Sequence, residues 1–131
     1  RWNKWLADQH GVPLMAYEGG QHVVPTSNST TLPWYDDYIA AQRDARMGQL
    51  YGSLLINYLE TLGAEGFMNF ASVSEINQFG AWGVLETGAS LPSQSPKYQA
   101  LTAFIQRSAV VPEPGACLLV VPAALLARRR R

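Results

Sequence analysis

The sequence predicts an α/β fold that corresponds to the C-terminal quarter of a (β/α)8 barrel, followed by a short C-terminal transmembrane helix. Short apolar runs alternate with amphipathic stretches in the order helix, strand, helix, strand, helix, which is typical of an α/β barrel or a doubly wound sheet. Two strands cannot close a barrel of eight, so we expect the last two strand-helix units of one. A separate apolar run with a basic end follows these units.

The first helix and strand are expected near the N-terminus. Residues 2–9 predict the end of an amphipathic helix, with Trp2, Trp5 and Leu6 on one side and Gly11 as its stop. Residues 12–17 (VPLMAY) predict a short buried strand that ends at the turn of residues 18–20. A polar loop is expected over residues 21–33.

The second helix, second strand and last helix follow this loop. Residues 35–62 carry apolar side chains at helical spacing up to Gly63, which predicts one long helix or two helices joined by a kink. Residues 65–71 (EGFMNFA) predict a second buried strand, and residues 72–95 a long loop. The last helix is expected over residues 96–107, because Ser95 and Pro96 favour a helix start.

Charge and cysteine content exclude several kinds of partner and cofactor. Ten basic and ten acidic residues give a net charge of zero, but residues 1–112 hold six Lys or Arg against nine Asp or Glu. An acidic body argues against a nucleic-acid partner. The single cysteine, Cys117, excludes an intrachain disulfide and cysteine-rich zinc sites. Because His10 and His22 lack the paired spacing of metal ligands, we expect no metal and no cofactor.

The C-terminal residues 111–131, VPEPGACLLVVPAALLARRRR, have three parts. Pro112 and Pro114 flank Glu113 and favour an extended, accessible backbone. The apolar run of residues 115–127 would span about 20 Å as a helix, against a hydrocarbon core of about 30 Å, so the expected membrane anchor is marginal. The four terminal arginines, Arg128, Arg129, Arg130 and Arg131, would stay on the cytoplasmic side.

This tail resembles a PEP-CTERM sorting signal. The resemblance implies an exosortase-type processing enzyme as a partner and export in a Gram-negative bacterium. It also implies transient anchoring in the inner membrane with the N-terminal side out, cleavage near residues 112–114, and delivery to the cell surface or extracellular matrix. A buried C-terminal helix or an anion-binding tail is the alternative. The order of the three parts favours the sorting signal.

Two stretches of the body resemble glycoside hydrolase barrels of clan A. The stretch AYEGGQH, residues 16–22, is similar to their seventh strand, and this resemblance implies that Glu18 is the nucleophile. Residues 67–86 (FMNFASVSEINQFGAWGVLE) and 95–101 (SPKYQAL) are similar to the eighth strand, its loop and the last helix. In such barrels a tryptophan near this strand stacks on a sugar ring, and Trp82 is the candidate. Catalytic groups of barrels lie at the C-terminal ends of strands, which is where Glu18 falls.

Three further residues are candidates for substrate binding. His22 can contact a sugar or orient Glu18, and Asn69 and Glu75 can hydrogen-bond to sugar hydroxyls. Three of the candidates, Glu18, His22 and Trp82, also have simpler explanations. Glu18 can accept from backbone amides in a turn, His22 can be a solvated loop residue, and Trp82 can plug the end of a barrel.

The sequence therefore predicts three segments: a partial barrel over residues 1–108, a linker over 109–114, and the sorting signal over 115–131. Because the chain begins with Arg1 and lacks an N-terminal signal, we expect it to be part of a longer exported protein. The expected function is that of a retaining glycoside hydrolase acting on polysaccharide. Such an enzyme needs a second carboxyl group, which clan A places on the fourth strand, so these residues alone are expected to be inactive. The alternative is a non-catalytic carbohydrate-binding or matrix protein with the same tail.

Overall fold

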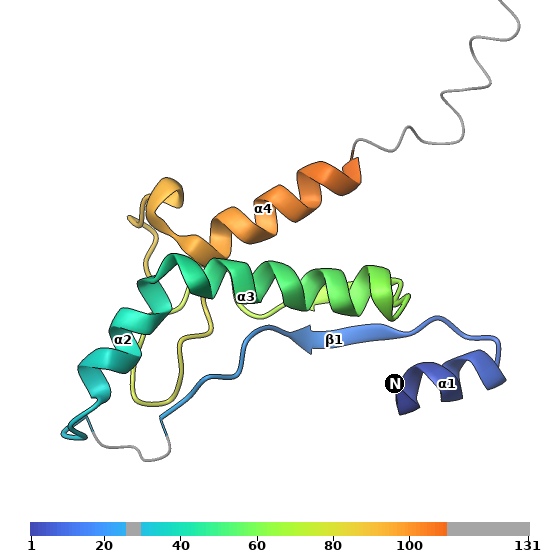
Figure 1. Cartoon of the computed structure of the whole chain (residues 1–131), viewed down its shortest axis with the longest axis horizontal. Coiled ribbons are helices and arrows are strands. Elements are labelled where there is room, and N and C mark those ends of the chain that lie inside the picture. The colour runs from blue at the N-terminus through green and yellow to red at the C-terminus, as the bar shows by residue number, and fades with distance from the viewer. Residues whose placement is uncertain (26–29, 110–131) are drawn as a thin grey trace, which may run out of the picture.

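The computed structural model describes residues 1–25 and 30–109 of the chain. Within them lie four α-helices and one parallel two-stranded sheet (Figure 1). In chain order the elements are α1 (Trp2–Gln9), β1 (Met15–Gly19), α2 (Tyr35–Arg43), α3 (Ala45–Leu55), a π-helical segment (Ile56–Thr61), β2 (Gly66–Asn69), a 3-10 turn (Pro92–Gln94) and α4 (Pro96–Ala109). The expected order of helices and strands and the parallel pairing are confirmed.

The two strands pair in a register that contains one bulge. Met15 pairs with Gly66 and Ala16 with Phe67, but the next pair is Gly19 with Asn69. Two residues of β1 therefore lie opposite one residue of β2, and the strand alternation breaks there. Gly19 is required at this place, because a Cβ on it would lie 2.4 Å from a ring carbon of Phe67.

The helical crossover between the strands breaks at Asp44, so two helices joined by a kink replace one long helix. Asp44 has φ −70° and ψ 140°, an extended conformation that no α-helix can contain. Its side chain accepts a hydrogen bond from the Arg46 amide at 2.8 Å and caps the start of α3. At the far end the crossover stops at Gly63, whose φ of 73° suits glycine.

The hydrophobic core lies between the sheet, α3 and α4. It is centred on three side chains, of which Tyr51 and Leu55 are 1% exposed and Val84 is 5% exposed. Phe67 from β2 and Leu101 from α4 are among the half-buried side chains that pack against these three. In Figure 1, α3 runs along the sheet and α4 lies on its other side. The strands are therefore covered by helices on one face.

The expected barrel quarter with a transmembrane helix is wrong, and the structure is a small mixed α/β unit. Alternating helices and strands are common to every parallel α/β unit, so the pattern does not fix the strand number or the curvature that a barrel needs. Across the described ranges, no helix has the length and apolar character needed to cross a membrane. The expected membrane segment, residues 115–131, lies outside those ranges.

Candidate functional site

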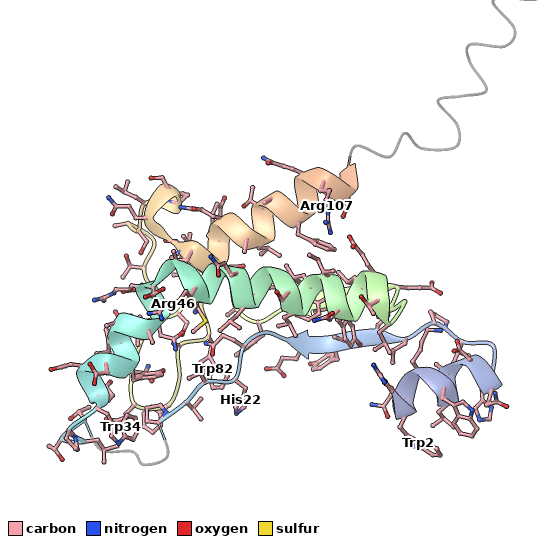
Figure 2. The ribbon with its side chains drawn as sticks, viewed as in Figure 1. Trp2, His22, Trp34, Arg46, Trp82 and Arg107 are labelled. Atoms are coloured by element: carbon pink, nitrogen blue, oxygen red, sulfur yellow. The ribbon has the colours of Figure 1, made fainter. Side chains whose placement is uncertain are left out.

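A pocket lies at the carboxyl ends of the two strands. Its volume is about 430 Å³. Its lining residues come from the end of β1, from the segment that follows β1, and from the segment that follows β2: Glu18, Gly19, Gly20, Gln21, His22, Phe70 and Trp82. Figure 2 shows His22 and Trp82 next to each other beyond the arrowhead of β1. The structure thus brings together three of the residues that the sequence predicted, Glu18, His22 and Trp82.

Parallel pairing explains why these segments meet, because the carboxyl ends of parallel strands share one edge of the sheet. Backbone hydrogen bonds then extend the pairing beyond the strands. The Phe70 amide donates to the Gly19 carbonyl at 2.8 Å, and the Ala71 amide donates to the Trp82 carbonyl at 3.0 Å. The Val84 amide returns a bond to the Ala71 carbonyl at 2.9 Å. Trp82 is therefore held beside the end of β2 although thirteen positions separate it from Asn69.

The bulge of β1 determines where Glu18 lies. With strict alternation, Glu18 would lie on the same side of the strand as Ala16, which is partly buried. The bulge instead leaves both Tyr17 and Glu18 exposed, and Glu18 borders the pocket. Within the described residues its carboxylate forms no ion pair. The carboxylate is therefore free to accept hydrogen bonds from a ligand or to act as a nucleophile.

Aromatic rings also line the pocket. The imidazole of His22 meets the indole of Trp82 edge-on, with centroids 4.9 Å apart and an interplanar angle of 68°. The ring of Phe70 lies 6.3 Å from the indole. Gly80 makes room for this arrangement, because a Cβ on it would lie 2.2 Å from an atom of the indole. Aromatic rings and a carboxylate in the lining of one pocket suit a ligand with an apolar face and hydroxyl groups.

Gln21 is a lining residue that the sequence did not single out. Its side-chain amide donates to the Ala81 carbonyl at 2.7 Å and to the Gln42 side-chain oxygen at 3.3 Å. Its own side-chain oxygen accepts from the Val23 amide at 2.7 Å. Gln21 thus ties the floor of the pocket to α2 and to the segment that carries Trp82. Phe70 was also missed, although its place near the end of the strand predicted over residues 65–71 was a usable signal.

The other predicted binding residues lie outside the pocket lining. Asn69 accepts a hydrogen bond from the Tyr51 hydroxyl and donates to the Ala71 carbonyl at 3.2 Å, so its side chain faces α3. Glu75 is exposed in the segment after β2. Their roles toward a ligand stay predictions. The predicted processing residues, Pro112, Glu113, Pro114 and the four terminal arginines, lie outside the described residues.

The described residues contain no cluster of metal-ligating side chains. Among residues 1–25 and 30–109, no three His, Cys, Asp or Glu side chains converge closely enough to hold a metal ion.

Comparisons with known proteins identify no relative of this chain. No protein-family model, no curated protein and no solved structure matches the chain.

Proposed function

We propose that this protein is exported to the cell surface and binds polysaccharide in the strand-end pocket, where Glu18 occupies the nucleophile position of a glycoside hydrolase-like site. The observation that carries this proposal is the convergence of an unpaired carboxylate and an indole in one pocket at the ends of two parallel strands. Sugar-active sites at strand ends need both groups, since the apolar face of a sugar stacks on an aromatic ring while its hydroxyls need acceptors.

The pocket has a suitable size and chemistry for one sugar ring. Its volume of about 430 Å³ falls in the usual range of small-molecule sites, roughly 300–1,000 Å³. Trp82 and Phe70 offer faces for the C–H groups of the ring. Glu18 offers an acceptor for hydroxyl groups, and His22 offers a donor or an acceptor. Both apolar and polar groups of the lining can therefore contact a bound ring.

Glu18 supplies the first half of a double-displacement reaction. One oxygen of its carboxylate attacks the anomeric carbon, the bond to the leaving oxygen breaks, and a glycosyl ester forms that water then hydrolyses. The leaving oxygen needs a proton from a second carboxyl group about 5–5.5 Å from the first. Glu18 is the only carboxylate among the described residues that line this pocket. Among the described residues, the lining of this pocket therefore contains no candidate for the acid.

Cleavage beyond residue 109 is compatible with this role. In Figure 1 the C-terminal end of α4 lies away from the arrowhead of β1, and the described residues that line the strand-end pocket all lie between Glu18 and Trp82, so such cleavage would leave this lining intact. The Pro-Glu-Pro motif, the apolar run of residues 115–127 and the four arginines support sorting to the surface through an exosortase-type enzyme.

The decisive test of the pocket compares Glu18→Gln with Glu65→Gln in the full-length protein. Glu65 is an exposed carboxylate at the other end of the sheet and serves as the matched control. We expect Glu18→Gln to lower polysaccharide hydrolysis by at least about 10³-fold, because an amide cannot form the glycosyl ester, whereas Glu65→Gln stays near the wild-type rate. Labelling with a 2-deoxy-2-fluoro glycoside, followed by mass spectrometry, should place the adduct on Glu18.

The outcomes separate catalysis from binding. Hydrolysis at the wild-type rate in Glu18→Gln would disprove the nucleophile assignment. If the wild-type protein binds polysaccharide without hydrolysing it, and Trp82→Ala abolishes binding, the protein is a carbohydrate-binding surface protein. If neither binding nor hydrolysis occurs, the proposal fails entirely.

The sorting part is tested separately. Replacing Arg128 to Arg131 with Ser should cause loss of processing or of surface delivery in the native bacterium, because the basic end fixes membrane orientation. Cell fractionation and immunoblotting measure both. Unchanged processing and delivery in this variant would contradict the sorting assignment.

A further inference from the structure

The described residues also form a second cavity, which the proposed function does not use. Its volume is about 290 Å³. It is enclosed by the end of α2, the segment that follows β2, and the first turn of α4. Its apolar wall includes Ile76, Val84 and Leu91, and its charged members are Arg43, Glu86 and Lys97.

Lys97 brings a buried cation with spare donors to this cavity. The residue is only 5% exposed, and its Nζ donates to the Ala81 carbonyl at 2.6 Å. An ammonium group has three donors, and this is its only hydrogen bond within the described residues. Burial lowers the pKa of Lys97 to about 8, and the nearby Glu86 carboxylate opposes that change. At neutral pH the group is still mainly charged.

Gln42 brings a second donor without an acceptor. Its residue is 2% exposed, and its Oε1 accepts from the Gln21 side chain at 3.3 Å. Its Nε2 is buried and has no hydrogen-bond partner in the described part of the chain. Buried amide donors are nearly always paired, so this group calls for an acceptor.

No hydrogen bond joins the one carboxylate of the cavity, that of Glu86, to Lys97 or Gln42 in the described part of the chain. Both oxygens of Glu86 already accept from Arg43, one from Nε and one from Nη2, each at 2.8 Å. Two cations and one carboxylate leave the cavity with one net positive charge. The cavity therefore holds an excess of donors and of positive charge, both of which a single anionic group would balance.

We infer that this cavity binds a small carboxylate with a short aliphatic chain, held by Lys97 and Gln42. One carboxylate oxygen accepts from Lys97 Nζ and the other from Gln42 Nε2. The aliphatic chain lies against the apolar wall that Val84 and Leu91 provide. A monoanion matches the single net positive charge, whereas a dianion such as hydrogen phosphate would leave a buried negative charge. The inference does not rest on Glu18 or on the sorting tail.

The test is a titration of the full chain, labelled with ¹⁵N and ¹³C, with sodium butyrate at pH 7. We expect saturable NMR shifts of the Gln42 side-chain amide and of the Lys97 Cε resonance. Butan-1-ol, which has the same chain without the charge, should cause no saturable shift, and sulfate, a dianion at this pH, should bind at least about tenfold more weakly than butyrate.

Two variants assign the site. Lys97→Met and Gln42→Leu should each weaken butyrate binding at least about tenfold. Lys4→Met is the matched control, because Lys4 lies on α1 and pairs with Asp8 far from the cavity, and it should leave binding unchanged. Near-UV circular dichroism verifies that each variant is folded.

Several results would overturn the inference. They are the absence of saturable shifts with butyrate, equal shifts with butan-1-ol, binding of sulfate as tight as that of butyrate, or wild-type affinity in folded Lys97→Met. If Lys97→Met fails to fold, the wild-type titrations against the alcohol and sulfate still decide. Loss of polysaccharide binding leaves this result unaffected, so the two proposals fail independently.

Discussion

The two faces of the β1-β2 sheet differ sharply in what they contact. On the helix-covered face, Phe67 packs against the core of Tyr51 and Leu55, and Asn69 binds the Tyr51 hydroxyl. Met68, which lies between them in β2, is 59% exposed on the opposite face. Tyr17 in β1 is 90% exposed. Among the described residues, one face of the sheet therefore packs against the core and stabilises the fold, whereas the other face is exposed to solvent.

This difference shows where stability and binding are separated in the molecule. The covered face fixes the positions of α3 and β2, and with them the strand ends. The strand-end pocket lies at the edge of the sheet, so its carboxylate and rings do not have to fill the core. Substitutions in the two regions should consequently change different measurements.

The largest expected contrast is between Leu55→Ala and Met68→Ala. Leu55 is 1% exposed, so its truncation should lower the free energy of unfolding by about 2–5 kcal/mol. Truncation of the exposed Met68 should cost less than about 1 kcal/mol. Urea denaturation followed by circular dichroism measures both. Equal losses would mean that the open face is covered in solution.

A smaller effect is expected when the close packing at the end of β1 is disturbed. Gly19→Ala places a methyl group against the Phe67 ring, so it should cost about 1–3 kcal/mol of stability and distort the pocket. Gly52→Ala is the control, because it lies in α3 and nothing is within 4 Å of its added Cβ. That change should stabilise the protein by up to about 1 kcal/mol. A neutral Gly19→Ala would show that Phe67 does not hold the strand end.

The smallest expected effect is a pH dependence of the free energy of unfolding, which the buried Lys97 causes. Burial lowers the pKa of Lys97 to about 8 from 10.5, so above pH 8 the folded protein releases a proton that the unfolded chain retains. The free energy of unfolding should therefore rise with pH, by at most about 1 kcal/mol per pH unit. The scan should end near pH 9.5, because Tyr38 and Tyr51, whose pKa is raised to about 12, begin to act in the opposite direction above pH 10.

Lys97→Met removes the titrating group and should flatten this dependence. Denaturation midpoints collected between pH 7 and 9.5 measure it for both proteins. The same slope in the variant as in the wild-type chain would assign the effect to another group and contradict the burial of a charged Lys97.

Local patterns in the sequence predicted the element order well. Helix starts and stops such as Pro96 and Gly63 depend on neighbouring residues, so they can be recognised without a fold. The barrel was wrong because curvature and strand number depend on contacts that no local pattern records. Glu18, His22 and Trp82 were found together because each stands near a predicted strand end or in its loop.

Other parts of the sites could not be predicted, because their contacts join distant positions. Gln21 reaches Ala81 across sixty positions, and the bulge that exposes Glu18 depends on pairing with β2. Nothing in the sequence indicated that Lys97 is buried, because a lysine in the first turn of a helix is ordinarily solvated.

The sequence by itself determined the order of helices and strands, because hydrophobic spacing, proline and glycine act over a few residues. It also contains the three-part tail of residues 111–131, whose chemistry depends on order alone. Only the tertiary structure decided that the sheet has two strands, that Asn69 faces α3, and that a buried lysine and glutamine share one cavity. Burial and strand pairing depend on which segments meet in space. These segments are far apart along the chain, so local sequence patterns do not show that they meet.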